Sequence, residues 1–360
     1  MRTNLYRAGG VLAIGLLASA WAVAGEYGRS VFVLTSTNSA NGNAVVVFQL
    51  TTGAIPSLSM VDMLPTGGLG GASTNAGILQ FRNDFGAVAN YGSNTVSELM
   101  RDGDFISVGQ TINLANGCTK PDSVALSAGQ PFSISQGHLF VVGANCAESH
   151  DWPSGQLDGT VVSLTDPFAA QIAVGQSWAA VTLTSGSVVQ LPLTFGGALS
   201  GVSTTMALPA NANTVPLGEA FWGDLLGLTP AHSPDSFALI NKSQTVFPVI
   251  GPAPSYPTNA PCWVAKGAGN IWYTGNSPGQ AVSIFFSDGQ GGVFYKSAPL
   301  PGAPSDITVS PDGEWLAVIY SAGGEAYVAV FSIDAYGDLT PVATSSSVGV
   351  AAFSGVAFSQ

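Results

Sequence analysis

The sequence contains few charged residues and very few basic ones. Only 8% of the 360 residues are charged, and 21 Asp and Glu residues against 9 Lys and Arg residues give a formal net charge of −12. A chain this acidic is repelled by phosphate backbones and anionic lipid surfaces. We therefore expect no nucleic-acid binding, and a strongly anionic substrate would need a local cluster of the few basic side chains.

Cysteine is also scarce, and the count of 3 is odd: Cys118, Cys146 and Cys262. Cys118 lies just before the first strand of a predicted hairpin, and Cys146 lies just after its second strand. The two residues would meet at one end of an antiparallel pair, within reach of a disulfide. We predict a Cys118–Cys146 disulfide and a buried or partly buried Cys262 thiol; three reduced, packed thiols are the alternative.

Long apolar runs are absent except near the start of the chain. A basic beginning and an apolar stretch at 8–20 precede the sequence AVA at 22–24, which is typical of a secretory signal. We expect a signal peptide over residues 1–24, cleavage after Ala24, and a single secreted or periplasmic domain over 25–360. An uncleaved anchor is less favoured because the run is shorter than a span of about 20 residues. No transmembrane segment is expected in the mature chain.

Glycine and proline are abundant, with 45 and 22 residues, and 46% of the chain is hydrophobic. Disordered chains lack β-branched and aromatic residues, whereas this chain carries them throughout. The composition predicts an all-β fold with many tight turns.

A repeat of strands and turns organises the chain. Its last copy, at 304–346, reads as four strands with the turn SPDG between the first two. The pattern of the third and fourth strands recurs in seven segments: 43–58, 93–108, 157–167, 185–201, 235–251, 279–295 and 325–341. Four strands every 40–50 residues are typical of a β-propeller, here with seven blades. The long step before 157 and the short step after it predict an insertion followed by a trimmed blade.

The two ends of the chain complement each other. SVFVLTS at 30–36 has the pattern of a second strand without a first, and FSGVAFSQ at 353–360 has the pattern of a first strand without a second. We expect the C-terminal strand to pair with the N-terminal blade and to close the ring, which removes exposed sheet edges. A β-sandwich followed by a second domain is the alternative.

The sequence resembles the lactonase-type seven-bladed propellers, the family of phosphogluconolactonase and carboxymuconate lactonizing enzyme. The matching segments are NAVVVFQL (43–50), PTGGLGG (65–71), NYGSNTVS (90–97), APCWVAKGAGNIWYTGN (260–276) and SDITVSPDGEWLAV (305–318). The resemblance implies opening or closing of a lactone ring at the mouth of the central channel.

Active relatives place His, Glu and Arg side chains at that mouth, where Arg binds the substrate carboxylate or phosphate. This sequence departs from that pattern. Arg29 precedes the first strand, and Arg82 and Arg101 lie in turns on the face away from the interblade loops.

The segment GANCAESHDWPSGQLDG at 143–159 concentrates ionisable residues in an otherwise uncharged chain. We predict an enlarged loop on the channel-mouth face, held beside the disulfide. Glu148, His150 and Asp151 would act there as general base and orienting carboxylate for attack of water on an ester carbonyl. The alternative is a polar, solvated loop without chemistry.

Four further residues are candidate ligand contacts. Asp122 would lie across the channel mouth, Glu219 and Trp222 share the segment GEAFWGD, and Trp152 with Trp222 could form a platform for a sugar or aromatic ligand. Each tryptophan could instead pack in the core. We predict no metal and no cofactor, because a zinc site needs several convergent His or Cys ligands.

The sequence thus predicts an exported, monomeric, lactonase-like propeller that hydrolyses or forms a lactone, with a lactone or a carbohydrate-like molecule as ligand. The alternative is a secreted or envelope propeller without catalysis, which binds a small ligand or a protein through the same loops. A purely structural surface protein is a third hypothesis.

Overall fold

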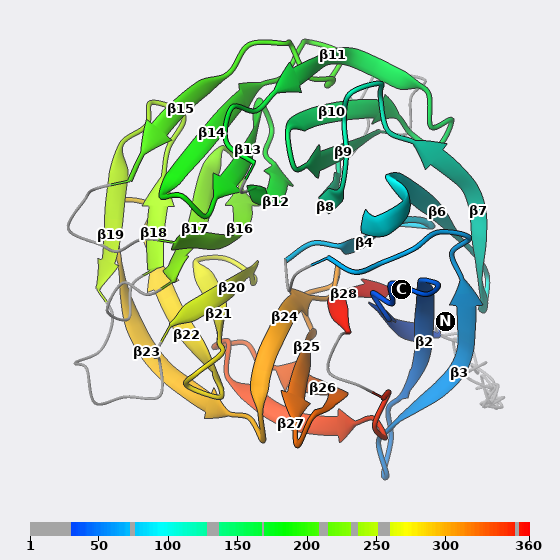
Figure 1. Cartoon of the computed structure of the whole chain (residues 1–360). Coiled ribbons are helices and arrows are strands. Elements are labelled where there is room, and N and C mark those ends of the chain that lie inside the picture. Colours follow the sequence, from blue (N-terminus) through cyan, green and yellow to red (C-terminus); the bar gives the residue numbers. More distant parts are fainter. Residues whose placement is uncertain are drawn as a thin grey trace, which may run out of the picture.

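A computed structural model describes residues 30–72, 76–127, 137–167, 169–208, 215–231, 237–250, 260–349 and 353–360. They form a ring of seven four-stranded antiparallel blades around a central channel (Figure 1). The predicted fold is confirmed. The predicted signal peptide lies outside the described residues. Within the described ranges, no helix is long and apolar enough to cross a membrane.

Each blade runs from an inner strand beside the channel to an outer strand at the rim. The strands of the first four blades are, in that order, β28 (Ser354–Ser359), β1 (Val31–Ser36), β2 (Ala44–Thr51), β3 (Ser57–Pro65); β4 (Leu79–Arg82), β5 (Phe85–Asn90), β6 (Thr95–Asp102), β7 (Phe105–Asn113); β8 (Pro121–Leu126), β9 (His138–Gly143), β10 (Cys146–Asp151), β11 (Leu157–Ser163); and β12 (Ala169–Val174), β13 (Trp178–Leu183), β14 (Ser187–Pro192), β15 (Thr204–Ala207).

The remaining three blades follow the same order. Their strands are β16 (Val215–Trp222), β17 (Leu225–Ala231), β18 (Phe237–Ile240), β19 (Val246–Ile250); β20 (Pro261–Lys266), β21 (Ile271–Asn276), β22 (Ala281–Ser287), β23 (Gly292–Pro299); and β24 (Ala303–Val309), β25 (Trp315–Ala322), β26 (Glu325–Ile333), β27 (Leu339–Thr344). A short parallel pairing of β19 with β23 joins the rims of blades 5 and 6. A single 3-10 turn, η1 (Tyr91–Ser93), links β5 to β6.

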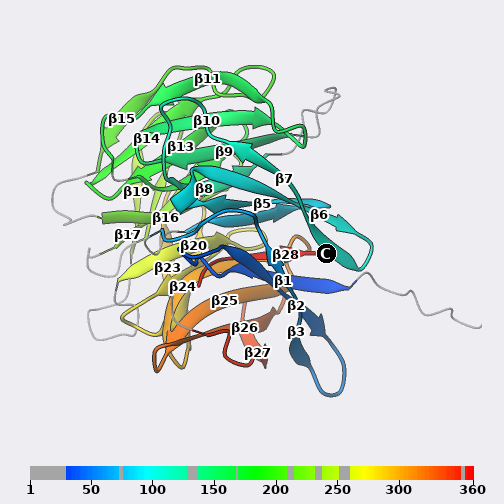
Figure 2. The same ribbon diagram turned by 45° about the vertical axis from the view of Figure 1, so that its right-hand side comes forward.

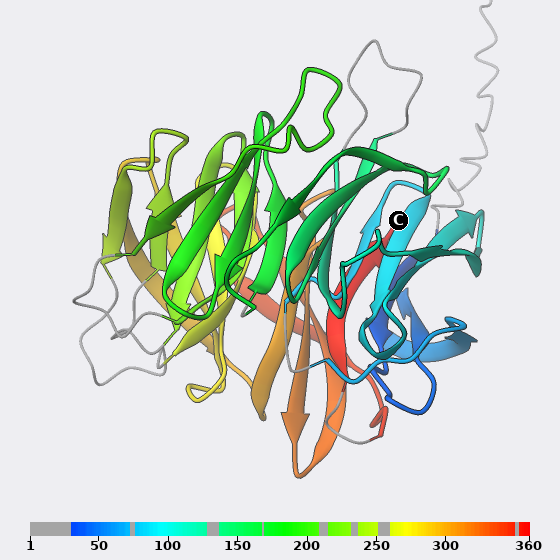
Figure 3. The same cartoon turned by 45° about the horizontal axis from the view of Figure 1, so that its top comes forward.

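The C-terminal strand closes the ring as predicted. β28 pairs antiparallel with β1, from Phe32 opposite Ser359 to Ser36 opposite Ser354 (Figure 2). In the view turned about the horizontal axis, β28, in red, lies inside the ring beside β4, in cyan (Figure 3). Arg101 fastens this junction, because its guanidinium donates to the Ser30 carbonyl and to Ser359 Oγ.

The last repeat was predicted closely, whereas the third was not. Strands expected at the end of the chain coincide with β24 to β27 within a few residues. The segment at 157–167, however, begins with β11, an outer strand, and the third strand of blade 3 is β10. The predicted insertion and trimmed blade are therefore wrong. The error arose because β10 carries CAESHD, a polar sequence without the apolar alternation of the other third strands.

The core lies between the blades. Leu34 of blade 1, Val88 of blade 2 and Val141 of blade 3 belong to one buried cluster, and the aromatic rings of Phe237, Trp272 and Phe285 fill the space between blades 5 and 6. Side chains of β-branched and aromatic residues suit this packing of pleated sheets face to face.

Three of the motifs that carry the family resemblance have structural roles. Asn90 ends β5 and donates to Ser97 Oγ, and Asn276 ends β21 and donates to Ser283 Oγ, so the same spacing recurs in blades 2 and 6. In PTGGLGG, a Cβ on Gly68 would lie only 2.4 Å from the Asn90 side chain. The glycine therefore allows this loop to pack against the buried amide.

The antiparallel order gives the ring two distinct faces. Inner strands begin at the face that carries the connections between blades, which we name the interblade face. They end at the opposite face, which carries the turns between first and second strands and which we name the hairpin face.

Candidate functional site

A central cavity of about 220 Å³ lies within the ring and receives residues from all seven inner strands. Its polar lining includes Gln80, Gln171, Glu219, Lys266 and Asp306. Gln80, Lys266 and several apolar lining residues stand at or near the ends of their strands, so the cavity extends toward the hairpin face. This position differs from the interblade face on which the catalytic loop was predicted.

Hydrogen bonds link neighbouring inner strands around this cavity. The Gln171 side chain donates to the Glu219 carbonyl and accepts from the Glu219 amide, at 2.9 and 2.8 Å, and so joins β12 to β16. Ser123 Oγ donates to the Gly77 carbonyl and accepts from the Ile172 amide. These bonds satisfy polar groups that the channel would otherwise leave without partners.

Asp306 occupies the place where the ring closes. Its carboxylate accepts from the amides of Ile307, Gly77 and Val356, at 2.9, 3.4 and 3.2 Å. Burial raises the pKa of Asp306 to about 7, although these three amides oppose the rise. The carboxyl group therefore changes its charge near neutral pH, within the wall of the cavity.

Glu219 is a second buried acid in the lining, with only 1% of its surface exposed. Burial raises the pKa of Glu219 well above its usual value, and the nearby amides of Ala173 and Thr182 offset only part of that rise. Among the described residues, neither carboxyl oxygen completes a hydrogen bond of normal geometry. Burial therefore favours the protonated form of this acid.

Among the described residues that line the cavity, Lys266 is the only basic one. Its ammonium lies 4.9 Å from the Trp222 ring centroid and 5.2 Å from that of Trp272, and Nζ donates to the carbonyls of Gly267 and Gly269 at 2.7 Å each. Burial lowers the pKa of Lys266 to about 8. The rings and carbonyls hold the amine in one place at the end of β20.

The predicted catalytic residues Glu148 and His150 lie in β10, so the prediction of a loop is wrong for Cys146–Asp151. Both side chains are buried, and Glu148 Oε1 lies 2.9 Å from His150 Nε2. Glu148 also accepts from the Ala115 amide, and His150 Nδ1 donates to the Gly155 carbonyl. Neither residue lines the central cavity. Their catalytic role stays a prediction, and the geometry favours a structural pair.

The other predicted residues are distributed over the ring. Asp151 ends β10 and accepts from Ser154 Oγ at the following turn. Asp122 is buried near the start of β8. Trp222 is exposed at the end of β16, beside Lys266, and Trp152 is buried after β10. The structure thus brings Glu219 and Trp222 to the cavity region and leaves Glu148, His150 and Asp151 in blade 3.

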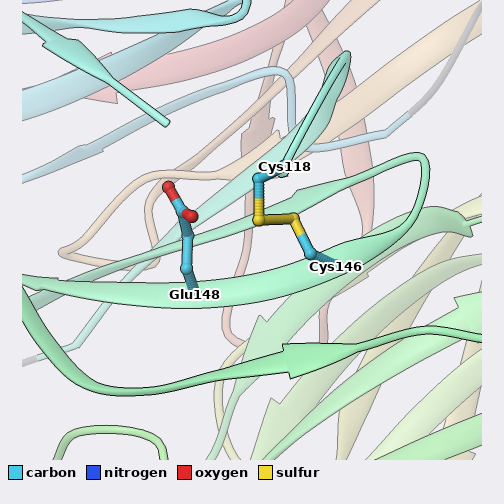
Figure 4. A group of neighbouring side chains, drawn as sticks. All are labelled: Cys118, Cys146 and Glu148. Carbon is cyan, nitrogen blue, oxygen red and sulfur yellow. A yellow bond between two sulfur atoms is a disulfide. The ribbon is translucent and has the colours of Figure 1, made fainter. Parts of the chain in front are cut away.

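The predicted disulfide is present. Cys118 and Cys146 are joined across the beginning of blade 3, with Cα atoms 5.6 Å apart (Figure 4). Cys262 is a buried free thiol, and burial raises its pKa to about 11. Glu148 lies beside the disulfide, and its carboxylate and the two sulfurs fall within 4.8 Å of one another. Oxidised sulfurs offer no thiolate, so this trio does not suit a metal ion.

Lys266, Asp306 and Gln171 were missed by sequence reasoning. Lys266 closes the segment CWVAK and Asp306 lies within PSDITV, both at inner strands of recognised repeats. The scarcity of basic residues was the available signal for Lys266, since a lysine on an inner strand stands out in this chain. No local sequence pattern identifies Asp306 or Gln171, because most of their hydrogen-bond partners are backbone groups of other strands.

Solved structures of the same architecture resemble this chain over nearly its whole length. A Lactobacillus plantarum protein has a TM-score of 0.68 at 14% identity, covering 92% of this chain and 100% of its own. The periplasmic gluconolactonase of Pseudomonas aeruginosa has 0.64 at 14%, covering 92% and 99%. A candidate 6-phosphogluconolactonase from Bacteroides fragilis has 0.63 at 13%, with the same coverage of 92% and 99%.

The shared feature is the fold. The predicted resemblance to lactonase-type propellers is confirmed at that level. No protein-family model matches the sequence, and neither does any curated protein.

Proposed function

We propose that this chain is an exported hydrolase that opens a small lactone ring in its central cavity. The observation that carries the proposal is the joint presence of Glu219, Lys266 and Asp306 in the lining, on the successive inner strands β16, β20 and β24. An acid, a cation and a base from three neighbouring strands are the groups that ester hydrolysis uses.

Each group has a role that its environment supports. The Asp306 carboxylate takes a proton from the attacking water, since a base with a pKa of about 7 is half ionised at neutral pH. The Lys266 ammonium stabilises the negative charge that develops on the carbonyl oxygen. The Glu219 carboxyl, whose pKa is raised by burial, donates a proton to the ring oxygen as the carbon–oxygen bond breaks. The products are a carboxylate and a hydroxyl group on one open chain.

The charge of the whole chain favours a neutral substrate. Lys266 is the one cation among the described residues that line the cavity, and the chain as a whole carries a formal charge of −12. A phosphorylated lactone would be repelled by this field. Export is supported by the disulfide, which persists in oxidising compartments, and by the architecture shared with a periplasmic gluconolactonase.

Proton release from a panel of neutral and anionic lactones tests the proposal. We expect saturable turnover of neutral lactones by the chain from Gly25 onward, and a fall of about 100-fold in kcat for Lys266→Met. Lys242→Met is the matched control, because Lys242 is exposed, its ammonium donates to Ser177 Oγ, and it does not line the cavity. No turnover by folded wild-type protein, or equal turnover by both variants, would overturn the proposed chemistry.

Ligand binding without catalysis is the second candidate. It is favoured by the hydrogen bonds that already occupy both oxygens of Asp306, since hydrogen bonds to the charged form make a carboxylate a weaker base. Saturable binding of a lactone or sugar without proton release would support this candidate.

A further inference from the structure

A second cavity, of about 230 Å³, lies on the hairpin face between blades 2 and 3. We name it the Arg82 cavity, and its lining consists of Arg82, Asn83, Asp84, Phe85, Leu126, Ser127 and Trp152. Arg82 ends β4 and Trp152 follows β10, so both side chains belong to strand ends on this face. None of the groups assigned above to lactone opening lines it.

Two hydrogen-bond donors in this lining have no acceptor within the described protein: the buried indole of Trp152 and the exposed guanidinium of Arg82. Trp152 is 4% exposed, and within the described part of the chain its indole Nε1 has no hydrogen-bond partner. The guanidinium of Arg82 makes no hydrogen bond, ion pair or ring contact in the same ranges. A buried N–H without an acceptor costs free energy comparable to a lost hydrogen bond, which a ligand oxygen would restore.

Arg82 is exceptional among the basic residues of the described ranges. Every other Lys and Arg there contacts an acceptor, an acid or an aromatic ring: Arg101 with Ser30 and Ser359, Lys120 with Tyr91, Lys242 with Ser177, Lys266 with Gly267 and Gly269, and Lys296 with Asp338. In a chain with so few cations, an arginine that serves no internal contact is available for a ligand.

The chemistry of the lining selects a carboxylate. A guanidinium presents a planar fork that matches the two oxygens of a carboxylate, and the indole N–H adds a third donor. Phe85, Leu126 and Trp152 supply apolar walls for an attached carbon chain. Asp84 lies in the same lining and adds negative charge, which disfavours a phosphate dianion.

The Arg82 cavity lies beside other cavities of the ring. An adjoining cavity of about 340 Å³ shares Arg82, Asn83 and Leu126 with it, and shares Gln80, Thr308 and Val309 with the central cavity. The three cavities therefore adjoin one another along the hairpin face.

We propose that the Arg82 cavity is a binding site for a small organic carboxylate, whose oxygens accept from the Arg82 guanidinium and from the Trp152 indole. The site goes beyond the proposed lactone hydrolysis and stands without it. If the central cavity opens lactones, the carboxylate products belong to the class that this site binds.

The indole ¹⁵N–¹H signal of Trp152 provides the test, with hexanoate as probe and hexanamide as its neutral counterpart. The signal is identified by its loss in Trp152→Phe. We expect hexanoate to shift it saturably, hexanamide and inorganic phosphate to leave it in place, and Arg82→Gln to weaken the hexanoate response about tenfold or more. Lys242→Gln is the matched control and should respond like wild type.

Several results would overturn the assignment. An equal shift with hexanamide would show binding without carboxylate recognition, and an equal shift with phosphate would show a site for anions in general. An unchanged response in Arg82→Gln, or no response of the wild-type signal, would likewise contradict it. None of these readings depends on turnover, so they are distinct from a failure of the lactonase proposal.

Discussion

In blade 3, the Glu148 carboxylate and the His150 imidazole are held by each other and by two backbone groups, the Ala115 amide and the Gly155 carbonyl. Both side chains are withdrawn from solvent, at 0% and 2% exposure. An ionisable pair in this setting contributes by satisfying its own polar groups, and removal of one partner leaves the other without compensation.

This arrangement predicts how the pair responds to substitution. His150→Ala should lower the free energy of unfolding by about 3–5 kcal/mol, because the Glu148 carboxylate would stay buried without its partner. The double variant Glu148→Leu/His150→Leu should lose distinctly less, since neither polar group remains to be left without its partner. Urea unfolding of both variants measures the difference. Equal losses in the two variants would contradict a buried, mutually compensating pair.

The sequence shows that ionisable residues are unusually dense at 143–159, but it did not show where their side chains lie in the structure. Sequence reasoning expected a loop at the channel mouth, either catalytic or merely solvated, because Glu and Asp are mostly exposed. The structure instead pairs Glu148 with His150 inside a sheet, where each needs the other. Whether two polar residues on one strand face solvent or each other depends on the neighbouring strands, and the local sequence does not contain that information.

At the scale of the strand, the packing between blades 5 and 6 connects the core to the cavity. Gly227 lies in β17 against Trp272, and the Trp272 ring also lies under the Lys266 ammonium. A Cβ at position 227 would lie 2.4 Å from Trp272 Cζ3 and 2.8 Å from Phe237 Cζ. Both rings are buried and have little room to move.

Gly227→Ala should therefore lower the free energy of unfolding by about 1–3 kcal/mol, because the added methyl group overpacks this aromatic cluster. Gly196→Ala is a suitable control, since the nearest atom to its Cβ, Thr194 Oγ1, is 3.7 Å away. Chemical denaturation of the two variants provides the comparison. If Gly227→Ala is as stable as Gly196→Ala, the packing described for β17 is wrong.

Strand prediction succeeded where hydrophobic alternation and turn residues agree. The segment WLAVIY before a glycine-rich turn gave β25, and AYVAVFSI gave β26, because apolar residues fill both faces between neighbouring blades. Hydrophobic alternation did not reveal β10, because its buried positions are filled by the disulfide and the Glu148–His150 pair. A strand stabilised by specific polar contacts lacks the periodicity on which prediction depends.

At the scale of the whole molecule, the ring brings together residues that are far apart in the sequence. Asp306 of β24 binds the amides of Gly77 and Val356, so one side chain joins the last blade to the first two. The repeat and the complementary chain ends were sufficient to predict the ring and its closure. The lining of the cavity was not predictable, because each of the seven inner strands contributes only a few residues to it.

The most direct test of the central claim is the pH dependence of kcat/KM for hydrolysis of a neutral lactone. Activity should rise as Asp306 loses its proton near pH 7 and should fall as Lys266 loses its proton near pH 8. Asp306→Asn should remove the rising limb and Lys266→Met the falling limb. A wild-type profile without these limbs, or both limbs intact in both variants, would contradict catalysis in the central cavity.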